Sequence, residues 1–162
     1  MNKDCKFKPM LKTSPLIRNI SFRYFILLFF LITSSFSKEG LNQDILKYTN
    51  QFRRSKGLSV LILRDDLNTI ARRHSEDMAK GRSGFGHTGY DQREQQVQKL
   101  IKPFHAMAEN VAYGAGSGKQ VVDLWKNSSG HRRNMLGNYK YIGIGTACNK
   151  QGIIFYTQIF VR

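Results

Sequence analysis

Residues 141–161, YIGIGTACNKQGIIFYTQIFV, predict the fold more directly than any other part of the chain. Apolar and small residues alternate over residues 141–147, and residues 153–161 are rich in β-branched and aromatic side chains, a pattern typical of β-strands. Residues 149–152 (NKQG) lie between these segments and have the chemistry of a turn. We therefore expect an antiparallel hairpin at the C-terminal end of the chain.

The segments before the hairpin repeat their apolar residues at helical spacing. Over residues 41–52 the apolar positions recur every three or four residues, so we expect a helix there that Gly57 ends. Asp65 or Asp66 can cap a second helix. The expected buried stripe of this second helix is Leu67, Ile70, Ala71, His74 and Met78. On such an apolar stripe, His74 is expected to be a core residue whose ring nitrogens find a backbone partner.

Further helices are expected between the second helix and the hairpin. A polar stretch leads to a short helix at Leu100 and Ile101, which Pro103 stops. Residues 118–126 have a broad apolar face, and Ser128 or Ser129 can cap one more helical turn as far as Met135. Helices followed by a hairpin predict an α+β fold, in which the helices pack on a small antiparallel sheet.

Residues 1–37 have the features of an export signal. Residues 1–23 contain six basic residues and one acidic residue, and the apolar run 24–32 (YFILLFFLI) follows directly. A membrane-spanning helix needs roughly 20 apolar residues, so this shorter run favours a signal peptide cleaved before Lys38. An uncleaved anchor that contacts the membrane through this segment is the alternative. Both place a single domain, residues 38–162, outside the cytoplasm, either secreted or exposed at the envelope.

The domain formed by residues 38–162 is strongly basic. Of the chain's 26 basic and 11 acidic residues, six and one fall in residues 1–37, which leaves 20 and ten and a net charge of +10. Such a charge attracts anionic surfaces, among them phospholipids and envelope glycans, although basic residues scattered along the chain can also serve solubility alone. Nucleic acid is not an expected partner, because the sequence contains no recognisable nucleic-acid-binding motif.

The chain has two cysteines, Cys5 and Cys148. Because Cys5 lies in the segment that we expect to be removed, the exported domain would keep one cysteine and no internal disulfide. Its stability must then come from the hydrophobic core, which a domain of this size can supply.

Five segments, taken in order, resemble the CAP superfamily of cysteine-rich secretory, antigen-five and pathogenesis-related proteins, and especially its bacterial SCP-like extracellular branch. Each segment alone is a weak signal, whereas their joint order and spacing over the domain are specific. The segments are residues 67–71 (LNTIA), 85–88 (FGHT), 108–114 (AENVAYG), 125–135 (WKNSSGHRRNM) and 141–145 (YIGIG) with 156–158 (YTQ).

The resemblance implies a three-layer α-β-α sandwich with a central cleft, which in many members holds two histidines and two acidic residues. Position by position, the first histidine of the family matches His87 and the first glutamate matches Glu109. The second glutamate of the larger members matches Ser128, and their last histidine matches Phe155, so two of the four positions differ here. In the bacterial branch the second histidine corresponds to His131. The resemblance therefore predicts a cleft lined by His87, Glu109, Ser128 and His131.

Two interpretations of this site are open. His87 and His131, with Glu109 as a third ligand, can bind a divalent metal such as zinc, since a catalytic zinc has about three protein ligands and one open position. Alternatively, a carboxylate between two imidazoles forms a hydrogen-bonded structural network without metal. Ser128 precedes a helical turn, which is more typical of a helix cap than of a nucleophile.

We assign no catalytic residue, and three hypotheses about function follow. The first is an exported, non-enzymatic module that binds a lipid, sterol, glycan or protein partner, because members of the CAP superfamily, which the chain resembles, are known mostly for binding. The basic charge favours an anionic envelope lipid or glycan. The second is a metal-dependent hydrolase that uses His87, Glu109 and His131. The third is a structural envelope protein.

Overall fold

In the computed structural model the described part of the chain is residues 38–162, which form a four-stranded sheet with helices on both faces. The helices are α1 (Lys38–Arg54), α2 (Asp65–Ala79), α3 (Tyr90–Leu100), α4 (Gly118–Asn127) and α5 (Ser129–Met135). The strands are β1 (Ile62–Leu63), β2 (Met107–Tyr113), β3 (Tyr141–Cys148) and β4 (Ile154–Val161).

The sheet has the strand order β1-β3-β4-β2. The predicted hairpin is formed by β3 and β4, and β2 pairs antiparallel with the other side of β4. The two-residue strand β1 pairs parallel to β3, so the sheet is antiparallel except at this edge. The α+β prediction is therefore confirmed, and β2 is left as the second edge of the sheet.

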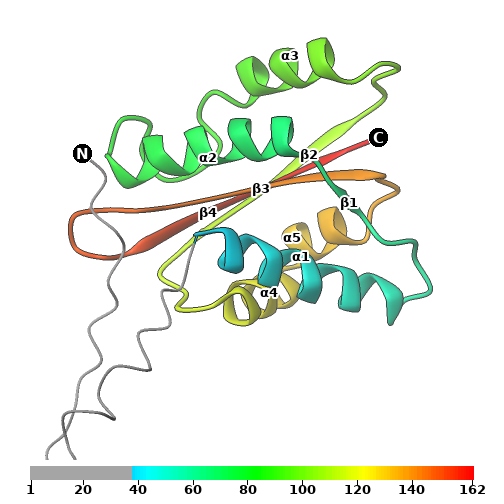
Figure 1. The fold of residues 1–162 in the computed structure, drawn as a ribbon, viewed down its shortest axis with the longest axis horizontal. Coiled ribbons are helices and arrows are strands. Elements are labelled where there is room, and N and C mark those ends of the chain that lie inside the picture. The colour runs from blue at the N-terminus through cyan, green and yellow to red at the C-terminus, as the bar shows by residue number, and fades with distance from the viewer. Residues whose placement is uncertain (1–37) are drawn as a thin grey trace, which may run out of the picture.

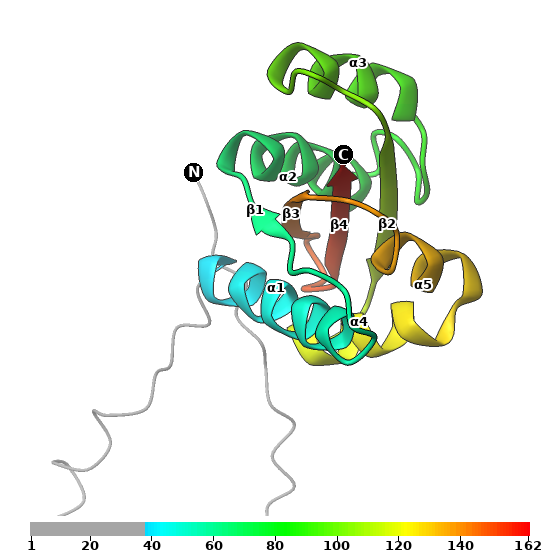
Figure 2. The same ribbon diagram turned by 90° about the vertical axis from the view of Figure 1, so that its right-hand side faces the viewer.

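The molecule has three layers, as the resemblance predicts. Helices α2 and α3 cover one face of the sheet, and α1, α4 and α5 cover the other (Figures 1 and 2). Each face has its own hydrophobic cluster. Along β4, Tyr156 and Phe160 pack towards α1 and α4, whereas Ile159 and Val161 pack towards α2. Because β4 is buried on both faces, its sequence is apolar almost throughout instead of alternating with polar residues.

Two glycines let α2 lie directly on β3. A Cβ atom on Gly145 would be 2.1 Å from the backbone nitrogen of Arg72, and a Cβ atom on Gly143 would be 2.5 Å from the backbone of Leu67. Both distances are much shorter than a van der Waals contact. Helix α2 can therefore approach β3 this closely only because these two residues have no side chain. The glycines of the YIGIG segment thus provide the docking surface for the second helix.

Two elements differ from the sequence prediction. Helix α3 covers the polar stretch before Leu100, where only a short helix at Leu100 and Ile101 was expected. This helix buries little more than Arg93 and Val97, so most of its residues face solvent and are polar. Strand β2, which contains most of the AENVAYG motif, was not predicted. The expected buried stripe of α2 is confirmed, with Ser75 added to it.

Two further expectations concern the cysteines and the N-terminal residues 1–37. Cys148, the last residue of β3, is disulfide-bonded, and the only other cysteine, Cys5, lies outside the described residues. The expectation of a domain with one cysteine and no internal disulfide concerns the chain after removal of residues 1–37, and it stays a prediction. Within residues 38–162, none of the helices combines the length and apolar character that a bilayer-spanning segment needs. The expected signal peptide or anchor, residues 1–37, lies outside the described part of the chain.

Substitution of Gly145 by alanine tests the close approach of α2 to β3. We expect the variant to lose about 1–3 kcal/mol of unfolding free energy, because the new methyl group collides with the backbone of α2. Gly130→Ala in α5 is the matched control, since its Cβ would meet no atom within 4 Å. Urea unfolding of both variants would contradict this account if Gly145→Ala were as stable as Gly130→Ala.

Candidate functional site

The candidate site is built around the edge strand β2. Successive side chains of a strand point to opposite faces of its sheet. Glu109 points to the face that carries α2 and α3, where it meets Arg93 of α3. Asn110 points to the opposite face, where it contacts α5. His87 lies in the loop that joins α2 to α3. The strand thus divides the site into two halves.

Glu109 is the most buried charged group of the site, with 1% of its side chain exposed. Both of its carboxylate oxygens bind the guanidinium of Arg93, with Nε 2.7 Å from Oε2 and Nη2 2.7 Å from Oε1. Nδ1 of His87 lies 2.8 Å from Oε1 of the same carboxylate. This two-pronged ion pair satisfies the geometry in which arginine binds a carboxylate most strongly. The negative charge of Glu109 is therefore balanced by Arg93, and the carboxylate lies beneath a half-exposed histidine.

Arg93 was not predicted as a site residue, although its sequence carried a usable signal. Tyr90, Arg93 and Val97 are spaced by three and four residues, which places them on one face of a helix. All three face inward: Val97 is fully buried, Arg93 is 8% exposed, and the Tyr90 hydroxyl donates to the carbonyl of Met107. A polar helix with one arginine on its only inward stripe indicates a buried acidic partner.

His74 lies next to this ion pair and behaves as the core residue that was predicted. Its Nε2 is 2.8 Å from the carbonyl oxygen of Gly86, a geometry in which the ring nitrogen donates, and 3.8 Å from Oε1 of Glu109. Burial, followed by the positive charge of Arg93, lowers the pKa of His74 even though the Glu109 carboxylate acts in the opposite direction. The buried cluster therefore contains a neutral imidazole, an arginine and a carboxylate.

His131 lies on α5, on the other side of β2 from Glu109. Its carbonyl oxygen accepts a hydrogen bond from Nδ2 of Asn110 at 3.2 Å. Burial lowers the pKa of His131, and a positive charge on His87 lowers it further, so the two imidazoles are electrostatic neighbours. Ser128 occupies the N-cap position of α5, as predicted, but its side chain caps none of the N–H groups of that helix.

The outer edge of β2 is covered by side chains. The carbonyl of Met107 accepts from Tyr90 as described, the carbonyl of Glu109 accepts from Nδ2 of Asn134 at 3.1 Å, and that of Val111 accepts from Nε1 of Trp125 at 3.2 Å. An uncovered edge strand is a template for pairing with another chain. Donors from three helices thus occupy the carbonyl groups that β2 directs away from β4.

The described residues do not offer the three ligands of a catalytic zinc site. Within residues 38–162, no group of three or more histidine, cysteine, aspartate or glutamate side chains lies close enough to hold a metal ion. Glu109 is committed to Arg93 through both oxygens, and a guanidinium cannot be deprotonated to release it. His87 and His131 as a pair of metal ligands stay a prediction.

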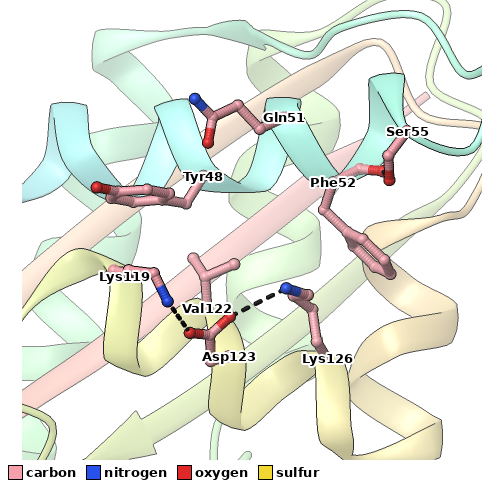
Figure 3. A pocket seen from close by; sticks show the side chains of 8 residues that line it. All are labelled: Tyr48, Gln51, Phe52, Ser55, Lys119, Val122, Asp123 and Lys126. Carbon is pink, nitrogen blue, oxygen red and sulfur yellow. Dashed lines mark hydrogen bonds and ion pairs between the residues drawn. The ribbon is translucent and has the colours of Figure 1, made fainter.

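A pocket of about 270 Å³ lies on the opposite face of the molecule, between α1 and α4 (Figure 3). Its wall combines Tyr48 and Phe52 of α1 with Lys119, Asp123 and Lys126 of α4. The two lysines both pair with Asp123, at 2.7 Å and 3.0 Å, which leaves the carboxylate between two cations. None of the predicted site residues lines this pocket.

Comparison with known proteins supports the resemblance that the sequence suggested. The family model of the cysteine-rich secretory protein family, CAP, matches residues 46–160, which is most of the described chain. The chain belongs to the CAP family. The uncharacterised protein YkwD of Bacillus subtilis (strain 168) is 31% identical over 128 residues, which cover 77% of this chain and 48% of that protein. The CAP domain therefore spans about half the length of this curated relative.

Solved structures show the same fold. An extracellular protein with an SCP domain from Bacillus anthracis has a TM-score of 0.66 and 30% identity, and the match covers 77% of this chain and 41% of that one. An outer surface protein from Borrelia burgdorferi has a TM-score of 0.65 at 20% identity, with 78% of this chain and 95% of that chain covered. The second likeness shows the fold alone, and there the fold makes up almost the entire chain.

Removal of the Arg93 guanidinium should destabilise the CAP domain strongly. Arg93→Met leaves the Glu109 carboxylate buried without its counter-charge, so we expect a loss of about 3–5 kcal/mol of unfolding free energy. In the control Arg72→Met, which removes an exposed pair with Glu76, the loss should be below about 1 kcal/mol. The double variant Arg93→Met/Glu109→Leu should recover much of the stability. Equal losses of unfolding free energy in Arg93→Met and Arg72→Met, measured by urea unfolding, would contradict this assignment.

The lowered pKa of His74 predicts a loss of stability in mild acid. At a pH below 6.5, its ordinary pKa, the unfolded chain binds a proton that the native chain does not. The free energy of unfolding therefore decreases as the pH falls from that value towards the lower native pKa. Urea unfolding at about pH 7.5 and about pH 5.5 should show this decrease, and His74→Gln should show a smaller one. An unchanged pH dependence in His74→Gln would rule His74 out as its source.

Proposed function

We propose that this CAP domain is an exported binding module for anionic lipid or glycan of the envelope, and that it is not a hydrolase. The observation that carries the proposal is the two-pronged ion pair between Arg93 and the buried Glu109. A binding surface needs exposed groups whose positions are fixed. The ion pair holds Glu109, and Glu109 in turn holds the exposed His87 through a hydrogen bond.

The same ion pair argues against general-base catalysis by Glu109. A general base must come within hydrogen-bonding distance of the proton that it removes, directly or through one water molecule. Both oxygens of Glu109 already accept hydrogen bonds, and 1% of its side chain is exposed. The groups that His87 and His131 present to solvent are suited to hydrogen bonding with a ligand.

Charge and the relatives support an envelope ligand outside the cytoplasm. The domain carries a net charge of +10, which favours association with anionic surfaces. Two structural neighbours are described as an extracellular protein and an outer surface protein. We therefore propose that residues 1–37 direct export, either as a cleaved signal peptide or as an anchor, and that the CAP domain acts at the cell envelope.

A binding panel with the full-length protein tests this proposal. Binding to phosphatidylglycerol vesicles and to soluble glycan strands of peptidoglycan is measured at about 50 mM and about 300 mM salt. We expect binding to at least one of these probes, with affinity that falls at the higher salt because attraction between exposed charges is screened. Absence of binding to both probes would support the structural envelope protein instead.

Zinc titration of the same protein tests the hydrolase alternative. We expect zinc to leave the melting temperature of the parent and of His87→Ala unchanged, because Arg93 holds the carboxylate that a third ligand would require. A zinc-dependent rise in the parent, lost in His87→Ala and accompanied by cleavage of peptide or cell-wall material, would replace the binding proposal with a metal-dependent hydrolase.

A further inference from the structure

Three aromatic side chains, two exposed and one partly buried, form a row beside His87, and we call Phe85, Tyr113 and Phe155 the aromatic row. The rings of Phe85 and Tyr113 meet edge to face with their centroids 4.8 Å apart. Tyr113 in turn stacks on Phe155 at 5.7 Å. More than half of Phe85 and of Tyr113 is exposed, 53% and 54%. The row is thus an ordered set of rings whose surfaces remain available to a ligand.

The aromatic row continues the polar site along the same strand face. Tyr113 lies four residues after Glu109 on β2, so their side chains share a face and are separated by about 13 Å. Phe155 is the register partner of Tyr113 on β4. Phe85 lies two residues before His87, so the loop between α2 and α3 runs beside the strand and contacts both groups. One strip therefore leads from an imidazole to three aromatic rings.

Such an exposed strip is not explained by the folding of the domain. Neither Phe85 nor Tyr113 belongs to the hydrophobic clusters on the two faces of the sheet. Full burial of one large apolar side chain stabilises a protein by about 1.5–3 kcal/mol, and these rings forgo much of that contribution. Contiguous exposed apolar groups with polar neighbours mark binding surfaces more often than scattered single residues do.

We propose that the aromatic row stacks the pyranose rings of an envelope polysaccharide, which names the ligand class of the binding site proposed above and rests on that proposal. A pyranose ring has a face of C–H groups, which packs on an aromatic ring, and a rim of hydroxyl groups, which needs hydrogen-bonding partners. The aromatic row supplies the ring surfaces. The Tyr113 hydroxyl and the His87 imidazole supply polar groups at the rim.

The hydrogen bond to Glu109 determines what His87 offers a ligand. Nδ1 lies 2.8 Å from a carboxylate that can only accept, so Nδ1 carries the hydrogen. In the neutral ring Nε2 is then an acceptor, which suits a sugar hydroxyl. Because Arg93 holds the carboxylate from its other side, the imidazole keeps its tautomer and its orientation. The buried ion pair thereby prepares an exposed acceptor next to the aromatic row.

The basic residues around the strip favour a sugar over a phospholipid headgroup. Arg93 pairs with Glu109, Arg82 pairs with Asp77, and Lys80 pairs with Glu76. Each of these three cations already has a carboxylate partner, so none of them is an unpaired charge for an anionic headgroup. Ring stacking does not depend on unpaired charge. We attribute a salt-insensitive part of the affinity to the aromatic row and the salt-sensitive part to the overall charge of the domain.

The test compares four variants of the full-length protein for binding to soluble glycan strands of peptidoglycan. Phe85→Ala and Tyr113→Ala should each weaken binding by about tenfold, because each removes one stacking surface. Tyr113→Phe keeps the ring and should stay within about threefold of the parent.

Leu124→Ala on α4 is the matched control, since Leu124 is also 53% exposed but lies on the opposite side of the sheet. It should bind as the parent does. Phe85 and Tyr113 lie on different elements, so one variant remains informative if the other does not fold.

The outcomes separate this inference from the proposed function. If the parent binds glycan strands and both alanine variants bind equally well, the aromatic row is not the ligand site, although the binding function stands. If the parent binds only phosphatidylglycerol vesicles and the alanine variants lose that binding, the row is a membrane contact and the polysaccharide assignment is overturned. If the parent binds neither probe, the proposed function and this inference both fail.

Discussion

The buried ion pair between Arg93 and Glu109 is the contact on which this side of the molecule depends. It joins α3 to the edge strand β2, although the two are separated in sequence by the loop around Pro103. Nη1 of Arg93 also donates to the carbonyl of Thr88, so the same side chain fixes the loop that carries His87. A buried charge without its partner is costly, and this cost makes one arrangement of helix, loop and strand strongly preferred.

Edge strand β2 determines how the rest of the site is organised. Its side chains alternate between the two faces of the sheet, so Glu109 and Asn110 serve different networks although they are adjacent in sequence. Its outward carbonyl groups are occupied by donors from α3, α4 and α5. These contacts hold helices from both outer layers against one strand. The two histidines consequently lie on different elements, His87 in the loop after α2 and His131 on α5.

This arrangement separates a buried carboxylate from the exposed groups that lie next to it. The carboxylate that a hydrolase would use is buried and neutralised, whereas His87 and the aromatic row are exposed on the adjoining surface. The buried group acts on the surface indirectly, because it sets the tautomer and orientation of His87. Under the proposed function, His87 and Glu109, which the resemblance matches to the first histidine and glutamate of the CAP superfamily, position a binding surface.

The sequence by itself determined the hairpin and the apolar stripes of α1 and α2. Local periodicity and turn residues are enough for such elements, because each is encoded by neighbours in the chain. The family resemblance placed His87 and Glu109 in one cleft, and the hydrogen bond between them came from the structure. Strand β2 and helix α3 were decided by tertiary structure. The few apolar positions of α3 gain stability only when packed on another layer, and the polar Glu109 and Asn110 in the middle of β2 are buried only because the fold supplies partners for them. The same holds for Arg93 as partner of Glu109 and for the position of His131. The spacing of Tyr90, Arg93 and Val97 indicates that Arg93 faces inward, but it does not identify Glu109 as the partner. The cost or benefit of the ion pair depends on burial that only the folded chain creates.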